Sequence, residues 1–260
     1  MNVTIGGEVD IFMLAEDLEL GGHHVVSMNT DGLTALVNKE KLEEYYQICK
    51  AWEVQVGNDT MGNLEYVEYE QLIQTSVNDY IAIKKGDEPI DKRTKKKGDF
   101  LTSYELHKNK SKSIIPIAIE QYFTKGTSIE ETIRNHNNIF DFTIAKKSSR
   151  DYSYEGVNKK TGQINTYNRL IRYYASTGIG EKLYKIKKPE SEKTGPPRSQ
   201  CESDSETQVI YNRPFKVDKW EDYKIDYKYY IRQTYKLLDQ LEAVKARDRK
   251  EAEKGVLLLF

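Results

Sequence analysis

The chain has 260 residues, of which 38% are hydrophobic and 31% charged, so it can form one large domain or two small ones with a heavily charged surface. Its formal net charge is only −1, but acidic residues concentrate over 8–70 and lysines over 84–112. Two cysteines in segments of different character argue against a disulfide framework or a structural zinc site, and the first residues have the pattern of neither a signal peptide nor a membrane span. We therefore expect a cytoplasmic protein without membrane contact.

The N-terminal part of the chain predicts an α+β unit in which helices pack on an antiparallel sheet. Apolar residues recur at helical spacing in two segments, and Asn38 is suited to cap the second of them. Asp31-Gly32 between two β-forming runs predicts a tight hairpin, because glycine accepts the positive φ of a primed turn. The expected elements are helices over 8–20 and 38–53 and strands over 24–28, 33–37, 64–73 and 77–83.

The later part of the chain predicts mainly helices. Pro116 can occupy the first turn of a helix that Gly126 ends, and 127–131 contains two overlapping capping boxes that start another helix. Residues 187–208 have almost no apolar content, and we expect them to form a mobile loop. Apolar residues over 227–244 repeat about every 3.5 residues, which predicts a long amphipathic helix.

Asp31, at the tip of the expected hairpin, is the candidate catalytic residue. Phosphoryl transfer to a nucleotide uses two divalent ions about 3.5–4 Å apart that carboxylates hold, and a rigid hairpin tip can immobilise such a carboxylate. Asn29, just before it, is neutral and a poor ligand for a hard cation. Taken alone, an Asp-Gly hairpin is more often only a turn.

The order of the segments gives Asp31 a context. The expected order is a helix, a hairpin with Asn29-Thr30-Asp31-Gly32 at its tip, a second helix, paired strands, a lysine cluster and a helical region. This order resembles the C-terminal half of a family B DNA polymerase, most closely of the phage type. That family has an Asp-Thr-Asp-Ser hairpin, often Asn-Thr-Asp-Gly in phage members, whose second acidic position binds the catalytic metal and matches Asp31. The resemblance implies a partial palm with an antiparallel sheet and packed helices over 1–105, a mostly helical thumb over 106–250 and a separate tail over 251–260. It also implies that Asp31 is a ligand of Mg²⁺ in a two-metal site.

The resemblance implies contacts to primer–template DNA as well. The family's Lys-x-Tyr element corresponds to Asn78-Asp79-Tyr80, where asparagine replaces the lysine, and the lysines that precede a glycine at the end of the palm correspond to Lys95-Lys96-Lys97-Gly98. Such lysines can neutralise phosphates without reading bases, although a basic run taken alone is more often a solvated surface. The expected DNA-binding residues are Asn78, Tyr80, Lys95, Lys96, Lys97 and Lys108.

An apolar tail follows the charged end of the expected long helix. Leu257, Leu259 and Phe260 resemble the peptide by which replicative polymerases hold a bacterial-type sliding clamp. A peptide of this kind docks its apolar side chains into a preformed pocket. The alternative is that the tail folds back onto the thumb.

The family's motif A aspartate, its fingers helix for the incoming dNTP and its exonuclease all lie upstream of this hairpin, and none has a counterpart here. One carboxylate cannot hold two ions, so we expect a part of a DNA-directed DNA polymerase that acts in DNA replication only after assembly with an N-terminal polymerase fragment. If the gene is phage-encoded, the setting is the host cytoplasm. The alternative is a non-catalytic DNA-binding or processivity module that retains the palm–thumb scaffold.

Overall fold

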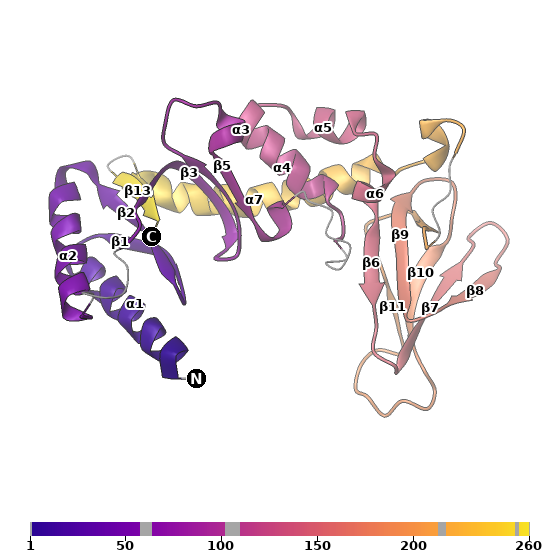
Figure 1. Ribbon diagram of the computed structural model, residues 1–260. Helices are drawn as coiled ribbons and strands as arrows, with labels where there is room; N and C mark the ends of the chain where they lie inside the picture. Colours follow the sequence, from indigo (N-terminus) through magenta and orange to yellow (C-terminus); the bar gives the residue numbers. More distant parts are fainter. Residues whose placement is uncertain (1, 58–63, 102–109, 213–216, 253–254, 260) are drawn as a thin grey trace. The chain divides into compact units, whose positions relative to one another are not determined.

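The computed structural model describes residues 2–57, 64–101, 110–212, 217–252 and 255–259 (Figure 1). The chain forms two compact units: the first contains Met1–Leu101 together with Leu238–Phe260, and the second contains Thr102–Leu237. The division after Leu101 lies close to the palm boundary expected from the sequence. The C-terminal part of the chain, however, belongs to the first unit instead of completing the second.

Two helices of the first unit confirm the helical spacing in the sequence. They are α1 (Asn2–Leu20), which begins earlier than expected, and α2 (Leu42–Gln55). The Asn38 side chain accepts a hydrogen bond from the Glu40 backbone N–H at 3.0 Å and caps the short 3₁₀ turn before α2, as predicted. On α1, Leu14 and Leu18 are fully buried, so one face of the helix packs into the core.

The first unit also contains a six-stranded antiparallel sheet, with the strand order β1-β2-β13-β3-β4-β5. Its strands are β1 (His24–Asn29), β2 (Gly32–Asn38), β3 (Val67–Ser76), β4 (Asp79–Lys84), β5 (Thr94–Lys97) and β13 (Gly255–Leu259). A one-turn helix, α3 (Ile90–Arg93), leads into β5. Both expected hairpins, β1–β2 and β3–β4, are present, so the α+β prediction for this part of the chain is confirmed.

Strand β13 lies in the interior of this sheet, between β2 and β3. Leu257 is the register partner of Leu36 on one side and of Tyr69 on the other, and Leu259 lies in the same strand. The expectation of a free tail is therefore wrong for this segment, because its backbone pairs with two strands at once. Phe260 lies outside the described residues.

Two apolar clusters are found among the described side chains of the first unit. The larger cluster joins α1, α2 and the β1–β2 hairpin and includes Leu14, Leu33 and Tyr45. The smaller cluster lies on β3 and β4 and includes Tyr69 and Tyr80. The hairpin that carries Asp31 and the β3–β4–β5 strands therefore each have an apolar cluster of their own.

His23, directly after α1, is buried without a polar partner. Its exposed fraction is 1%, and neither ring nitrogen has a hydrogen-bond partner among the described residues. The ring meets the ring of Tyr45 edge-on, with a centroid separation of 5.3 Å. Burial lowers the pKa of His23 below its usual 6.5, with a smaller opposing effect of Glu44, so the folded state favours the neutral ring.

We expect the stability of the first unit to fall as the pH drops below about 6.5, because the unfolded chain then takes up a proton that folded His23 resists. The loss continues until the pH reaches the lowered pKa of the folded state. Urea unfolding between about pH 7.5 and 5 measures it. His23→Phe should flatten the pH profile, because phenylalanine fills the same buried position and takes up no proton. An unaltered profile in His23→Phe would contradict this assignment.

The second unit contains several helices. They are α4 (Ile114–Lys125), α5 (Ile129–Asn135), α6 (Ile139–Phe142) and the beginning of α7 (Tyr227–Ala252), whose residues from Leu238 onward belong to the first unit. Gly126 ends α4 in the left-handed conformation, with φ of 67°, as predicted. The Ser128 hydroxyl accepts a hydrogen bond from the Glu131 backbone N–H at 3.2 Å and caps α5, which confirms the capping signal.

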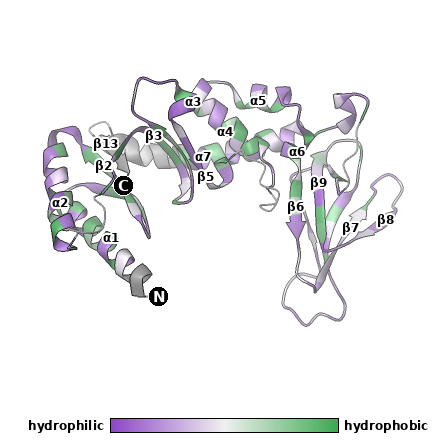
Figure 2. Cartoon of the chain, viewed as in Figure 1, coloured by the Kyte–Doolittle hydropathy of each residue, from purple (hydrophilic) through white to green (hydrophobic). Residues whose placement is uncertain are grey.

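Two antiparallel sheets lie between α6 and α7 in sequence, so the expectation of a mostly helical thumb is wrong. One sheet has the strand order β11-β10-β7-β8 and the other β12-β9-β6. The strands are β6 (Ile144–Lys147), β7 (Tyr152–Val157), β8 (Ile164–Tyr167), β9 (Leu170–Ser176), β10 (Lys182–Lys187), β11 (Arg198–Gln200) and β12 (Thr207–Ile210). Tyrosine and β-branched residues favour strands. In Figure 2, β9 contains hydrophobic residues, whereas β8 is mostly hydrophilic.

Residues 187–208 form the loop that their polarity suggested only in part. The segment contains β11 and reaches into β12, and Gln208 is completely buried. The Gln208 side-chain oxygen accepts a hydrogen bond from the Leu183 backbone N–H at 2.9 Å, and its amide donates to Ser205 Oγ at 3.0 Å. Buried polar side chains with satisfied hydrogen bonds thus hold a segment that has few apolar residues.

None of the helices in the described part of the chain combines the length and the apolar character needed to cross a membrane. Cys49 and Cys201 are both free thiols, the first buried and the second partly buried.

Candidate site around Asp31

The loop that carries Asp31 consists of Thr30 and Asp31 between the register partners Asn29 and Gly32. The Asp31 backbone N–H donates a hydrogen bond to the Asn29 side-chain oxygen at 3.3 Å, and the Thr30 hydroxyl donates to the Asp31 carboxylate at 3.5 Å. The predicted primed turn is wrong, because Gly32 is the first residue of β2 and none of these residues has a positive φ. The hydrogen bond to Asn29, and not a left-handed glycine, therefore holds the loop.

Asp31 is exposed and lines a pocket of about 160 Å³ within the first unit. The β1–β2 hairpin contributes one part of the lining, and β3, β4 and β5 contribute the other part through Gln74, Tyr80, Lys95 and Lys97. Four residues selected from the sequence (Asp31, Tyr80, Lys95 and Lys97) thus meet in one pocket. Gln74 was missed, because only its pairing with Tyr80 across the β3–β4 hairpin brings it there.

Strand alternation separates the three lysines of β5. Tyr80 is the register partner of Lys97, and Ile81 is the partner of Lys96. Successive side chains of a strand point to opposite faces, so Lys95 and Lys97 share the face of Tyr80 while Lys96 lies on the other. In agreement with this, Lys96 is absent from the pocket lining.

Asn78, which the sequence also selected for DNA binding, is not in the pocket lining. Asn78 is exposed in the β3–β4 turn, where its backbone N–H donates to Ser76 Oγ at 3.3 Å. Lys108 lies outside the described residues.

Gly98 ends β5 where that strand meets the β3–β4 turn. Its φ is 66°, and a Cβ atom at this position would lie 1.9 Å from Asp79 Oδ1 and 2.3 Å from the Asn78 carbonyl oxygen. The Asp79 carboxylate accepts hydrogen bonds from the Asp99 backbone N–H at 2.9 Å and from Ser76 Oγ at 2.7 Å. Asp79 thereby joins the end of β5 to the β3–β4 turn, and glycine is required for the close approach.

We expect Gly98→Ala to destabilise the first unit by about 2 kcal/mol, because the new methyl group overlaps backbone and a fixed carboxylate. Gly57→Ala is the matched control, since Gly57 also has a positive φ, 73°, but no atom of the described residues lies within 4 Å of its Cβ position. That variant should lose only about 1 kcal/mol, from backbone strain. Urea unfolding of both variants measures the difference, and equal losses would show that the contact with Asp79 contributes nothing.

Tyr80 forms part of the pocket wall and is only 7% exposed. The neighbouring Tyr69 is buried on the same two strands, and burial, with a smaller effect of Tyr80, raises the pKa of Tyr69 to about 12. Tyr69 therefore stays neutral near neutral pH and supports the wall as a packing residue.

Asp31 is the single acidic residue among the residues that line the pocket. Across the described residues, no group of three or more His, Cys, Asp or Glu is placed to hold a metal ion. Magnesium in phosphoryl-transfer sites is commonly bound by one or two carboxylates together with substrate phosphates and water. The exposed carboxylate of Asp31 fits the role of one such ligand, and the nearby lysines fit phosphate groups.

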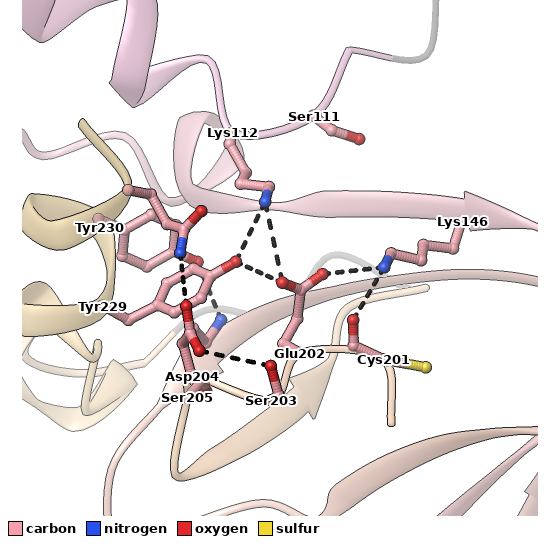
Figure 3. A network of polar contacts seen from close by, with 12 residues as sticks. Ser111, Lys112, Lys146, Cys201, Glu202, Ser203, Asp204, Ser205, Tyr229 and Tyr230 are labelled. Atoms are coloured by element: carbon pink, nitrogen blue, oxygen red, sulfur yellow. Dashed lines mark hydrogen bonds and ion pairs between the residues drawn. The ribbon is translucent and has the colours of Figure 1, made fainter. Parts of the chain in front are cut away.

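A second polar cluster, in the second unit, surrounds Glu202 (Figure 3). The Glu202 carboxylate accepts hydrogen bonds from the hydroxyls of Tyr229 at 2.5 Å and Tyr173 at 3.0 Å. It forms ion pairs with Lys146 at 3.0 Å and with Lys112 at 3.8 Å, and its side chain is only 11% exposed. Sequence reasoning missed this cluster, because its members are far apart along the chain.

Two lysines and a tyrosine outweigh the effect of burial on the Glu202 carboxylate. Burial alone would raise the pKa of Glu202, but Lys112, Tyr229 and Lys146 outweigh it and hold that pKa below its usual value. Burial lowers the pKa of the Lys112 ammonium, which the Glu202 carboxylate partly offsets. Each group has a partner of opposite charge or a hydrogen bond, so the cluster joins elements of the second unit and offers no free nucleophile.

This chain matches no family model, no curated protein and no solved structure.

Proposed function

We propose that this chain is a C-terminal palm-and-thumb part of a family B DNA-directed DNA polymerase. The observation that supports the proposal most is the pocket in which Asp31, Tyr80, Lys95 and Lys97 meet. These residues come from segments that are well separated in the sequence, and each was selected for its match to that family. If the Asp-Gly hairpin were only a turn, the lysines and the tyrosine would not be expected to lie beside the aspartate.

In this proposal Asp31 is a ligand of Mg²⁺, which would polarise the phosphates of a dNTP and stabilise the leaving pyrophosphate. Lys95 and Lys97 neutralise phosphates of the primer–template, and Tyr80 forms the wall against which they lie. An N-terminal polymerase fragment supplies the remaining carboxylates and the fingers, so the isolated chain does not synthesise DNA. The proposed setting is replication in the cytoplasm.

The remaining residues keep lesser roles in the proposal. Asn78 and Lys96 lie outside the pocket lining, and their contact with DNA, like that of Lys108, rests on the family resemblance alone. Binding of a sliding clamp through Leu257, Leu259 and Phe260 would require β13 to leave the sheet, because one backbone cannot pair with β2 and β3 and with a clamp at the same time.

The alternative function is a non-catalytic DNA-binding or processivity module. The same lysines support it, and Asp31 then only completes a turn.

We expect the double substitution Lys95→Gln and Lys97→Gln to weaken binding of the chain to primer–template DNA at least about tenfold at low salt, because two phosphate contacts are lost. The slope of log K against log salt should become shallower by about 1.8. Lys96→Gln is the matched control, since it removes one charge from the opposite face of the same strand. Fluorescence anisotropy with a labelled primer–template measures both. If Lys96→Gln weakens DNA binding as much as the substitution of Lys95 alone or of Lys97 alone does, the pocket is not the DNA site.

A further inference from the structure

The sheet of the first unit consists of two parts that β13 bridges. One part is the β1–β2 hairpin, which packs on α1 and α2, and the other is the β3–β4–β5 meander. Each part has its own strand pairing and its own apolar cluster among the described side chains. Without β13 both parts therefore keep their internal hydrogen bonds, and each has one open strand edge, on β2 and on β3.

The pocket draws its residues from both parts. Asp31 belongs to the hairpin, whereas Tyr80, Lys95 and Lys97 belong to the meander. The strand between the parts therefore sets the separation between the carboxylate and the lysines. Whatever occupies this position controls the geometry of the site.

We propose that the position between β2 and β3 is an acceptor site for an extended strand of a partner polypeptide, and that β13 occupies it in the isolated chain. An incoming strand would pair antiparallel with both β2 and β3, as β13 does, and would displace β13 from the sheet. The proposal deepens the proposed function, where a second polypeptide completes the site, but strand exchange itself is independent of DNA synthesis.

The segment that occupies the site indicates the chemistry of the partner. The segment 255–259 is uncharged and contains no proline, and it pairs with β2 over its whole length and with β3 over 257–259. In an interior strand every backbone N–H faces one neighbour or the other, so proline is excluded. The partner segment is therefore an extended, mainly uncharged strand that is recognised through its main chain.

Peptide binding tests the exchange. A chain that ends at Lys254 should bind a fluorescently labelled synthetic peptide of residues 251–260 with one-to-one stoichiometry in an anisotropy titration. The full-length chain should bind the same peptide at least tenfold more weakly, because its own β13 competes for the site. A peptide with Leu257→Pro should also bind the shortened chain at least tenfold more weakly. The full-length Leu257→Pro variant, which keeps its length and most of its contacts, should bind the unaltered peptide like the shortened chain does.

The proposal would be overturned if the full-length and shortened chains bound the peptide equally well. It would also be overturned if neither the shortened chain nor the full-length Leu257→Pro variant bound the peptide. If the full-length chain forms dimers and the chain that ends at Lys254 does not, the incoming strand belongs to a second copy of this chain. That result would overturn the proposal that a different polypeptide supplies the strand. None of these outcomes involves DNA. A negative result here therefore leaves the lysine experiment intact, and failure of that experiment leaves the strand exchange intact.

Discussion

Asp31→Asn should abolish primer extension by the chain in complex with an N-terminal polymerase fragment, with a loss of at least about 10³-fold. The substitution keeps the size of the side chain but removes the negative charge that binds the metal ion, and it occurs at an exposed loop position. Single-turnover extension of a labelled primer measures the loss.

The binding of primer–template should change little in Asp31→Asn, since the substitution leaves Lys95 and Lys97 in place. Glu40→Gln, which removes an exposed carboxylate outside the pocket lining, should retain full activity. Full synthesis by Asp31→Asn would favour the alternative function, in which the hairpin is only structural. Primer extension by the isolated wild-type chain would contradict the need for a second polypeptide.

Glu202→Ala should destabilise the second unit by about 3–5 kcal/mol, because it leaves two lysines and two tyrosine hydroxyls without the carboxylate that they share. The Lys112 ammonium is the group most affected, since burial already lowers its pKa. Urea unfolding measures the loss. The Cys201 thiol gives a second readout, because the Cys201 backbone oxygen accepts a hydrogen bond from Lys146 at 2.9 Å, and its labelling by a thiol reagent should become faster.

Asp204→Asn is the matched control for this prediction. Asp204 lies in the same loop and forms an ion pair with Lys236 at 2.6 Å, but both side chains are exposed, so its loss should cost far less stability than the loss of Glu202. Similar losses in Glu202→Ala and Asp204→Asn would show that burial of the first carboxylate is not what stabilises the loop.

Features that depend on a few neighbouring residues were predictable from the sequence. The caps at Asn38 and Ser128 and the helix end at Gly126 are hydrogen-bonding or backbone preferences within one turn. The β1–β2 hairpin also followed from local pattern, although its turn type did not: Asn29 accepts the Asp31 N–H, and Gly32 does not supply a positive φ. The hydrogen bond to Asn29 and a left-handed glycine can each close a loop of the same length, so the sequence pattern could not distinguish between the two kinds of turn.

Long-range pairing was beyond the sequence patterns. The helical expectation for the second unit relied on capping signals, whereas its strands are stabilised by partners far along the chain. Glu202 shows the same limit: polar residues of the segment 187–208 suggested a loop, yet lysines and tyrosines from other elements compensate the burial of its carboxylate.

By itself, the sequence determined that an aspartate stands at the tip of a hairpin and that a lysine cluster follows later in the chain, because these features arise from nearest neighbours. Only the tertiary structure decided that Lys95 and Lys97, but not Lys96, share a pocket with Asp31, and that residues 255–259 complete the sheet. The physical reason is that strand register and strand order depend on hydrogen bonds between segments distant in the chain. A one-residue change of register would have turned the lysines to the opposite face.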